Sequence, residues 1–206
     1  MNEAVDGLRI LAADEDREAL RRIADLLDGL GHRVTATAID PVEAAEAVAR
    51  EDPQLAVVAV HADDEHALDL IDEIGSFASG PIIALADDAD FARRAAARGI
   101  YAAVGDSDPE ALQSAIEVAM RRHAEHQALA SEVDRLQNAL ERRALIERSK
   151  GILMERHGIG DREAFDRLRA HARSHNRTVL DVARAVTEGH RLLGAPEPGG
   201  TQPDGA

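Results

Sequence analysis

The feature that most limits the fold is a near-continuous apolar run at residues 55–60, LAVVAV. Such a run is typical of a strand that is buried on both of its faces. Residues 81–86 form a second run of this kind. Strands buried on both faces belong to parallel sheets, in which crossover helices cover each side. We therefore expect a helix-covered parallel sheet.

Strand and helix patterns alternate along the first 120 residues. Strands are predicted at residues 8–13, 32–38, 55–60, 81–86 and 100–104. Helices are predicted at residues 19–27, 41–50, 68–74, 91–98 and from 109 to 119. Five strands alternating with five helices predict an α/β fold over residues 1–120, a flavodoxin-like, doubly wound, parallel five-stranded sheet.

Residues 136–194 predict a small three-helix bundle. The first helix should end at Gly158, a common stop signal. The second opens at Asp161, which we expect to be its N-cap. The third opens at Thr178 with Asp181 three residues later, a variant of the capping box. Phe165 lies on the apolar face of the second helix, so we expect it in the core and not as a platform for base stacking.

A linker helix is predicted over residues 121–143. Leu129, Val133, Leu136 and Leu140 step by four, three and four residues, which forms a two-heptad apolar stripe. The stripe predicts a parallel coiled-coil homodimer, although a single helix packed on its own domains would also bury it. The Gly/Pro-rich residues 195–206 predict a disordered tail.

Composition excludes several kinds of site. The chain has no cysteine, which rules out disulfides, thiolate metal sites and cysteine nucleophiles.

No segment resembles a signal peptide, and no apolar stretch approaches the length of a membrane helix, about 18 residues. We therefore expect a cytoplasmic protein that does not enter a membrane. No nucleophile, base or cofactor loop is in place, so we expect no enzyme, cofactor or metal site. His171 and His175 are four residues apart, but no third zinc ligand lies nearby.

Charge is distributed unevenly. Residues 1–120 hold 9 arginines and 26 acidic residues, a net charge of −17. Residues 142–194 hold 12 basic and 7 acidic residues, a net charge of +5. A basic module on an acidic carrier predicts a polyanion-binding end. We also hypothesise that the acidic part masks the basic face in an inactive state.

The basic module carries a specific motif. It reads R-x-x-I-x-x-S-K-G-I-L-M from Arg143, then A-F-x-x-L-R from Ala164 and A-R-S-H-N-R from Ala172. This pattern closely resembles the ANTAR module, the RNA-binding output domain of transcription antiterminators. Ser149 stands where the family usually has alanine, and Arg148 where it often has glutamine. Both changes are tolerable, because serine is also small and arginine adds charge.

The resemblance implies a dimer that engages two small hairpins with hexanucleotide loops in a nascent leader transcript. Binding would disfavour a terminator hairpin, so that polymerase reads through. The residues predicted to contact RNA are Arg143, Arg148, Lys150, Gly151, Arg169, Arg173, Asn176 and Arg177. Arg169, Arg173 and Arg177, each taken singly, could instead be solvated surface charges.

Two features of this set depend on helix geometry. Arg143 and Lys150 are seven residues apart, so they project from nearly the same face. Gly151 costs about 1 kcal/mol inside a helix relative to alanine, which indicates close approach by RNA or by a neighbouring helix. The turn from His175 to Arg177 lies near the start of the third helix, whose N-terminus would favour a phosphate.

An acidic cluster after the first strand resembles the receiver domain of two-component response regulators. The resemblance implies an acidic pair for Mg²⁺, an acceptor aspartate after the third strand, a hydroxyl after the fourth and a lysine after the fifth. Asp14 and Glu15 match the acidic pair, whereas Ala59, Ala86 and Asp106 occupy the other three positions. A methyl group cannot accept a phosphoryl group, and an aspartate would repel one. We predict a pseudo-receiver with a degenerate phosphoacceptor site.

Alternatives stay open at this point. The acidic residues 14–16 could be a residual metal site or only the acidic first turn of a helix. Asp63 or Asp64 could act as a displaced phosphoacceptor, which would make the chain a phosphorylatable response regulator. The bundle could also bind duplex DNA, or the chain could be a protein-interaction adaptor that binds no nucleic acid. The favoured interpretation is an RNA-binding antiterminator whose input is a sensor protein or a small ligand.

Overall fold

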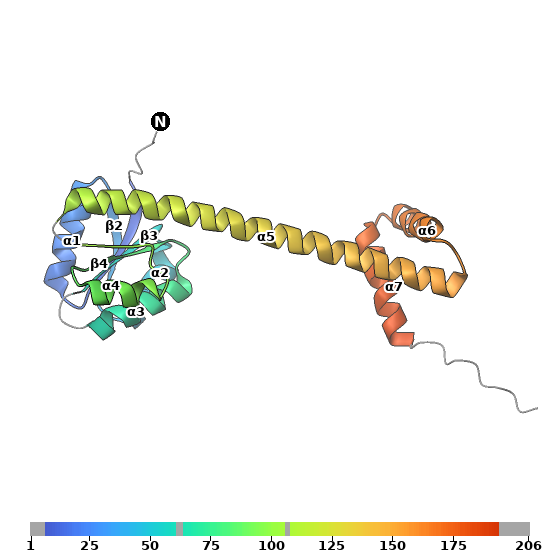
Figure 1. The fold of residues 1–206 in the computed structure, drawn as a ribbon, viewed down its shortest axis with the longest axis horizontal. Helices are drawn as coiled ribbons and strands as arrows, with labels where there is room; N and C mark the ends of the chain where they lie inside the picture. The colour runs from blue at the N-terminus through green and yellow to red at the C-terminus, as the bar shows by residue number, and fades with distance from the viewer. Residues whose placement is uncertain (1–6, 61–63, 106–107, 194–206) are drawn as a thin grey trace, which may run out of the picture. The chain divides into compact units, whose positions relative to one another are not determined.

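The computed structural model describes residues 7–60, 64–105 and 108–193 (Figure 1). The chain divides into two compact units, Met1–Leu129 and Ala130–Ala206, which we describe separately as unit 1 and unit 2. Helix α5 (Pro109–His157) contributes residues to both units, and it joins three segments that the sequence predicts as helical. The predicted tail lies outside the described residues.

Unit 1 contains a five-stranded sheet. Its strands are β1 (Arg9–Ala13), β2 (Arg33–Ala38), β3 (Leu55–Ala59), β4 (Ile82–Leu85) and β5 (Ala102–Val104). The strand order is β2-β1-β3-β4-β5, and every neighbouring pair is parallel. The predicted α/β class and the flavodoxin-like, doubly wound sheet are confirmed.

Helices cover both faces of the sheet. They are α1 (Arg17–Gly29), α2 (Pro41–Glu51), α3 (Asp64–Phe77), α4 (Ala89–Ala96) and the start of α5. Side chains alternate between the two faces of a strand, so Leu55 and Val57 join a core with α1 and α5. Ala56 and Val58 join the opposite core, with α2, α3 and α4. The apolar run at residues 55–60 therefore supplies both cores, as the sequence predicts.

Aspartates begin several helices of unit 1. Asp16, Asp40, Asp88 and Asp108 accept backbone N–H groups in the first turns of α1, α2, α4 and α5. The backbone N–H of Phe91, followed by that of Asp90, lowers the pKa of the Asp88 carboxyl. N-terminal carboxylates satisfy free donors and complement the helix dipole. Part of the acidic excess of unit 1 is therefore explained by capping.

Unit 2 consists of the end of α5, α6 (Asp161–Ser174) and α7 (Val179–Leu193). Its core is small: Leu168, Ala172 and Val182 are buried, with half-buried aliphatic side chains around them. Helix α5 ends at Gly158, whose φ of +62° suits glycine and whose N–H donates to the carbonyl of Met154 at 2.9 Å. The predicted three-helix module and its glycine stop are confirmed.

Candidate nucleic-acid interface

Lys150 occupies a different environment from the one that the sequence suggests. Its side chain is only 10% exposed, and Nζ lies 2.9 Å from Glu147 Oε2 and 2.5 Å from Asp161 Oδ1. Asp161, and then Glu147, raise the pKa of Lys150 above its usual value. An ammonium group held between two carboxylates is a poor donor to RNA. The structure therefore favours a role in joining α5 to α6 over the predicted direct contact.

The same ion pair corrects the predicted start of α6. The N-cap is Gly160, which makes no side-chain capping bond, and Asp161 is the first helical residue. The Asp161 carboxylate points to Lys150 instead of back to the backbone of its own helix. The ionised carboxylate would make a charge-assisted bond in either place, but with the Lys150 ammonium both partners carry a full charge.

Gly151 lies on an open surface. A Cβ atom built on it would have no heavy atom within 4 Å, so close packing within this chain does not explain the glycine. The neighbouring Ser149 is buried, and its hydroxyl donates to the carbonyl of Ile146 at 2.8 Å. Serine therefore meets its hydrogen-bonding need within its own helix, which explains why it can replace the alanine that is usual in the family.

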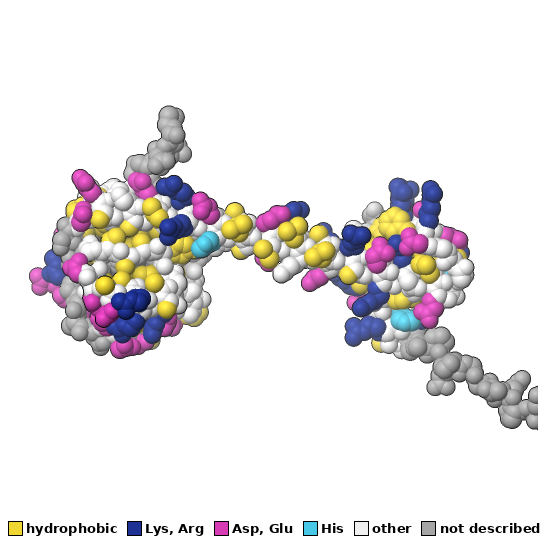
Figure 2. All heavy atoms as spheres, in the orientation of Figure 1, with side chains coloured by type: hydrophobic (Ala, Val, Ile, Leu, Met, Phe, Trp, Pro, Cys, Tyr) yellow, Lys and Arg dark blue, Asp and Glu magenta, His cyan; other side chains and the backbone are white. Residues whose placement is uncertain are grey.

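The predicted arginines are exposed, and none of them forms a side-chain hydrogen bond or ion pair with another described residue. Unit 2 has 11 arginines between residues 142 and 193, and among the described residues only Arg167 pairs with a carboxylate. The predicted members with no side-chain hydrogen bond or ion pair in the described chain are Arg143, Arg148, Arg169, Arg173 and Arg177. Lys and Arg side chains stand clear of this unit in Figure 2. Unit 2 thus presents cations that its own acidic residues do not neutralise.

The turn between α6 and α7 holds Arg177 in place. Asn176 takes the left-handed conformation at φ +52°, and the N–H of Arg177 donates to the carbonyl of Ala172 at 2.8 Å. Thr178 and Asp181 then cap α7 reciprocally: the Thr178 N–H donates to Asp181 Oδ2, and the Asp181 N–H donates to Thr178 Oγ1. The predicted capping box is confirmed.

This capping box bears on the predicted phosphate site at the start of α7. The hydroxyl of Thr178, followed by its N–H, lowers the pKa of the Asp181 carboxyl. Asp181 is therefore a carboxylate at neutral pH, and it already occupies the helix end. A phosphate would meet a negative charge there, so the arginine side chains are the better anion ligands.

Phe165 is not a core residue, which corrects the prediction. Its side chain is 39% exposed, whereas Ala164 and Leu168 are buried. Phe165 lies at the edge of the apolar arc of α6, and one turn further on the same ridge lies Arg169. A bundle of three short helices covers the centre of that arc but not its margin.

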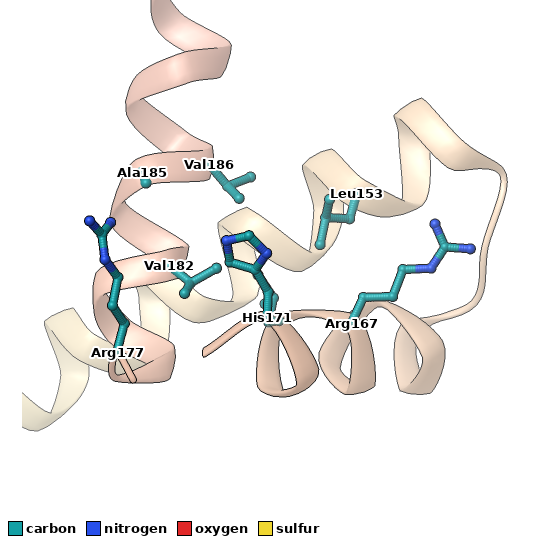
Figure 3. Close-up of a pocket in the computed structure, with 8 residues that line it drawn as sticks. Leu153, Arg167, His171, Arg177, Val182, Ala185 and Val186 are labelled. Carbon is teal, nitrogen blue, oxygen red and sulfur yellow. The ribbon is translucent and has the colours of Figure 1, made fainter. Parts of the chain in front are cut away.

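A pocket of about 380 Å³ opens between α5, α6 and α7 (Figure 3). Its lining residues are Leu153, Arg167, Leu168, His171, Arg177, Val182, Ala185 and Val186. The His171 ring stacks on that of His175, with centroids 4.0 Å apart. Of this lining, only Arg177 belongs to the predicted RNA contacts. The sequence signal that was available is the spacing of Arg167 and His171, one helical turn apart.

The predicted dimerisation residues are uncovered in the single chain. Leu129, Val133, Leu136 and Leu140 are 65%, 51%, 49% and 68% exposed. Every residue of α5 from 124 to 144 is exposed, and hydrophobic side chains follow this stretch in Figure 2. Within each unit, the described residues therefore leave the stripe uncovered.

The described part of the receiver-like site holds no phosphoacceptor aspartate on β3. Asp14 directly follows β1 and is buried, and its Oδ1 accepts the N–H of Asp16 at 2.7 Å. Glu15 is half-buried, Ala59 ends β3, and Ala86 follows β4. Asp106 lies outside the described residues, as does Asp63. Asp64 starts α3 and forms an ion pair with Arg94.

No group of three or more His, Cys, Asp or Glu side chains in the described residues could hold a metal ion. No described helix combines the length and apolarity needed to cross a membrane.

Comparison with known proteins decides the family. The ANTAR domain matches residues 134–186. Over 192 residues the chain is 32% identical to the transcriptional regulatory protein PdtaR of Mycobacterium tuberculosis, and the match covers 92% of each chain. The chain belongs to the ANTAR family of transcriptional regulators. This ANTAR-family protein is also 37% identical over 62 residues to the nitrate regulatory protein of Klebsiella oxytoca, which is 30% of this chain and 16% of that relative.

Solved structures support the receiver fold of unit 1. The signal receiver domain of a modulated diguanylate cyclase from Desulfovibrio desulfuricans G20 matches with a TM-score of 0.51 and 18% identity, covering 59% of this chain and 99% of the other. NtrX from Brucella abortus matches with a TM-score of 0.51 and 21% identity, covering 61% of this chain and 29% of the other. The ANTAR-family protein therefore combines a receiver-like domain with an ANTAR domain.

Proposed function

We propose that this ANTAR-family protein is an RNA-binding transcription antitermination regulator that engages hairpin loops in leader transcripts. The observation that carries the proposal is the set of exposed, unpaired arginines of unit 2, which includes Arg143, Arg169 and Arg177. Arginine side chains without internal partners are suited to phosphate, because the guanidinium fork matches its oxygens. Membership of a family of transcriptional regulators supports the proposal.

The arrangement on α6 suits a single-stranded loop. Arg169 and Arg173 lie one turn apart on an exposed face, and that face continues to Asn176 and Arg177 in the following turn. Arginines position the RNA backbone, while amide groups and guanidinium planes can read unstacked bases. Loops are the readable part of RNA, since the major groove of an A-form stem is too narrow for side chains.

The proposal includes a homodimer formed through the exposed stripe of α5. Parallel association of two copies would bury the four apolar side chains in a coiled coil. A dimer presents two ANTAR domains, one for each of two neighbouring hairpins, and binding the pair would compete with a terminator hairpin. The exposure of Leu129, Val133, Leu136 and Leu140 in the single chain supports this part.

The proposed input is a sensor protein or a small ligand, without phosphorylation of unit 1. Ala59 and Ala86 supply methyl groups where the acceptor and the hydroxyl would stand, and Arg94 neutralises Asp64. Incubation with acetyl phosphate and Mg²⁺ should leave the intact mass of the protein unchanged. A gain of one phosphoryl group would instead support a displaced acceptor.

The test of RNA binding is affinity for a paired-hairpin RNA with hexanucleotide loops across a salt series. We expect affinity that depends on loop sequence, falls with salt, and drops on Arg143→Ala. Arg21→Ala, an exposed arginine of α1 in unit 1, is the matched control and should have no such effect. Equal affinity for duplex DNA at matched salt would replace the RNA proposal by a DNA-binding one, and an absence of salt-dependent binding would favour an adaptor.

A further inference from the structure

The pocket between α5, α6 and α7 shares only Arg177 with the arginine face described above. Its floor is apolar: Leu168 and Val182 are buried, and Leu153 and Val186 are half-buried. These side chains belong to the core of unit 2, and α6, α7 and the end of α5 leave that core open between them. The pocket therefore has an apolar floor and lies within a domain of net positive charge.

The rim of the pocket is polar and cationic. Figure 3 shows the His171 ring pointing into the space between the helices, with Arg167 on one side and Arg177 on the other. Arg167 is partly neutralised, because its Nη2 donates to Glu163 Oε1 at 2.8 Å. The Arg177 side chain forms no hydrogen bond or ion pair with any described residue, and it interacts with the Asp181 carboxyl only through a longer-range charge attraction, which lowers the pKa of Asp181. One rim cation is therefore available to a ligand.

We infer that this pocket receives one unstacked nucleobase of an RNA loop, an inference that rests on the proposed function. The volume of about 380 Å³ is near the lower end of small-ligand pockets, which suits one base. The apolar floor takes the ring, and the fork of Arg177 meets a base acceptor or the adjoining phosphate. This site would set which loop sequence is bound, while the arginines of the outer α6 face supply affinity.

Charge complementarity favours a nucleotide over an aliphatic side chain of another protein. A protein side chain would fill the floor but would bring no anion to Arg177, which would then be desolvated without a partner. A nucleotide brings a flat ring and a negative charge in one group. A side chain of a second copy or of another protein therefore becomes an outcome of the test.

The test starts by selecting hairpins with a randomised six-nucleotide loop on the full-length protein. Failure to select any RNA would count against the proposed function itself. With a selected hairpin, each loop position is replaced in turn by an abasic nucleotide, and affinity is measured at constant salt. We expect one position at which removal of the base weakens binding by about tenfold, as for loss of a stacked base.

Two leucine variants then assign that position to the pocket. Ala185→Leu fills the mouth of the pocket from an exposed helical position, and Ala170→Leu adds the same volume at an exposed position of α6 outside the lining. Ala185→Leu should bind the intact loop about tenfold more weakly and lose nothing further with the abasic loop. Ala170→Leu should behave like the wild type.

Other outcomes overturn the inference while the proposed function stands. One is an abasic penalty that is the same in wild type and in Ala185→Leu. Another is a change in oligomeric state by light scattering, with loop discrimination intact, which would assign the pocket to a protein contact. Thermal unfolding checks that the variants fold, and Ala185→Met is the substitute should Ala185→Leu fail.

Discussion

The two units of the molecule treat their arginines in opposite ways. In unit 1, five of the eleven arginines form ion pairs with described carboxylates. In unit 2, two of the twelve arginines, Arg135 and Arg167, have a described carboxylate partner. The numbers of arginines are similar, so the difference lies in their surroundings. Unit 1 pairs about half of its arginines with its own carboxylates, and unit 2 leaves most of its arginines exposed without such a pair, as the proposed binding of RNA requires.

The apolar residues show the same contrast. Unit 1 encloses two cores between its sheet and its helices, and the positions of its degenerate site are filled by small apolar side chains such as Ala59. Unit 2 has one small core, and it leaves Phe165 and the α5 stripe uncovered. This contrast agrees with the proposal that unit 1 is a receiver without phosphotransfer chemistry and that unit 2 binds RNA through exposed apolar and cationic groups.

The largest effect is expected from breaking the α5 stripe. Leu136→Lys places a charge in the predicted coiled-coil seam, so the protein should become monomeric by light scattering. Affinity for a paired-hairpin RNA should fall on the order of 100-fold, because the second hairpin would no longer be bound intramolecularly. Affinity for a single hairpin should not change.

The control for this prediction is Ser131→Lys, which adds the same charge to an exposed position of α5 off the stripe. It should remain dimeric. A monomeric wild-type protein that still binds paired hairpins better than single ones would refute the role given to the stripe.

The next effect is expected on the arginine face. Arg169→Ala combined with Arg173→Ala should weaken hairpin binding about tenfold or more and lower the salt slope by about 2, since two phosphate contacts are lost. The matched pair is Arg17→Ala with Arg21→Ala, also exposed and four residues apart, on α1. If both pairs lowered the slope equally, the contrast between the two units would not concern RNA.

The sequence predicted most of the fold because its signals are local. Alternating burial in β3, the left-handed Gly158 and the Thr178–Asp181 capping box each depend on a few neighbouring residues. The site was harder to predict. Helical spacing places Lys150 beside Arg143, but it cannot show that Asp161 crosses the turn to reach Lys150.

The same limit explains Phe165 and the pocket. Periodicity assigns Phe165 to an apolar arc, but the number of neighbours that cover the arc depends on the size of the bundle. The residues that line the pocket come from three helices, so no single stretch of sequence predicts the pocket. Residue type predicted which side chains of unit 2 could contact RNA, and packing decides which of them are exposed.

A smaller effect tests the hypothesis that unit 1 masks unit 2. Net charges of −17 and +5 should make the full chain bind RNA a few-fold more weakly than residues 121–206 alone at low ionic strength. The difference should vanish at about 0.5 M salt, because exposed charges are then screened over a few ångströms. Equal affinities at low salt would exclude masking.

The smallest effect on RNA binding is expected at Lys150, although the sequence places it among the contacts. Lys150→Met leaves Glu147 and Asp161 without their shared cation, so α6 should exchange its amide hydrogens faster. The dependence of hairpin affinity on salt should not change.

The effect of Lys150 on α6 should depend on pH. Because the pKa of folded Lys150 is raised above its usual 10.5, the stabilisation of α6 by the Lys150 ammonium is complete below pH 10.5 and is lost as the pH rises further. The difference in exchange between wild type and Lys150→Met, corrected for the intrinsic rate, should therefore be constant from about pH 7 to 9 and shrink in alkali. If Lys150→Met instead lowered the salt slope of hairpin binding by about 1 and left amide hydrogen exchange in α6 unchanged, Lys150 would contact RNA after all.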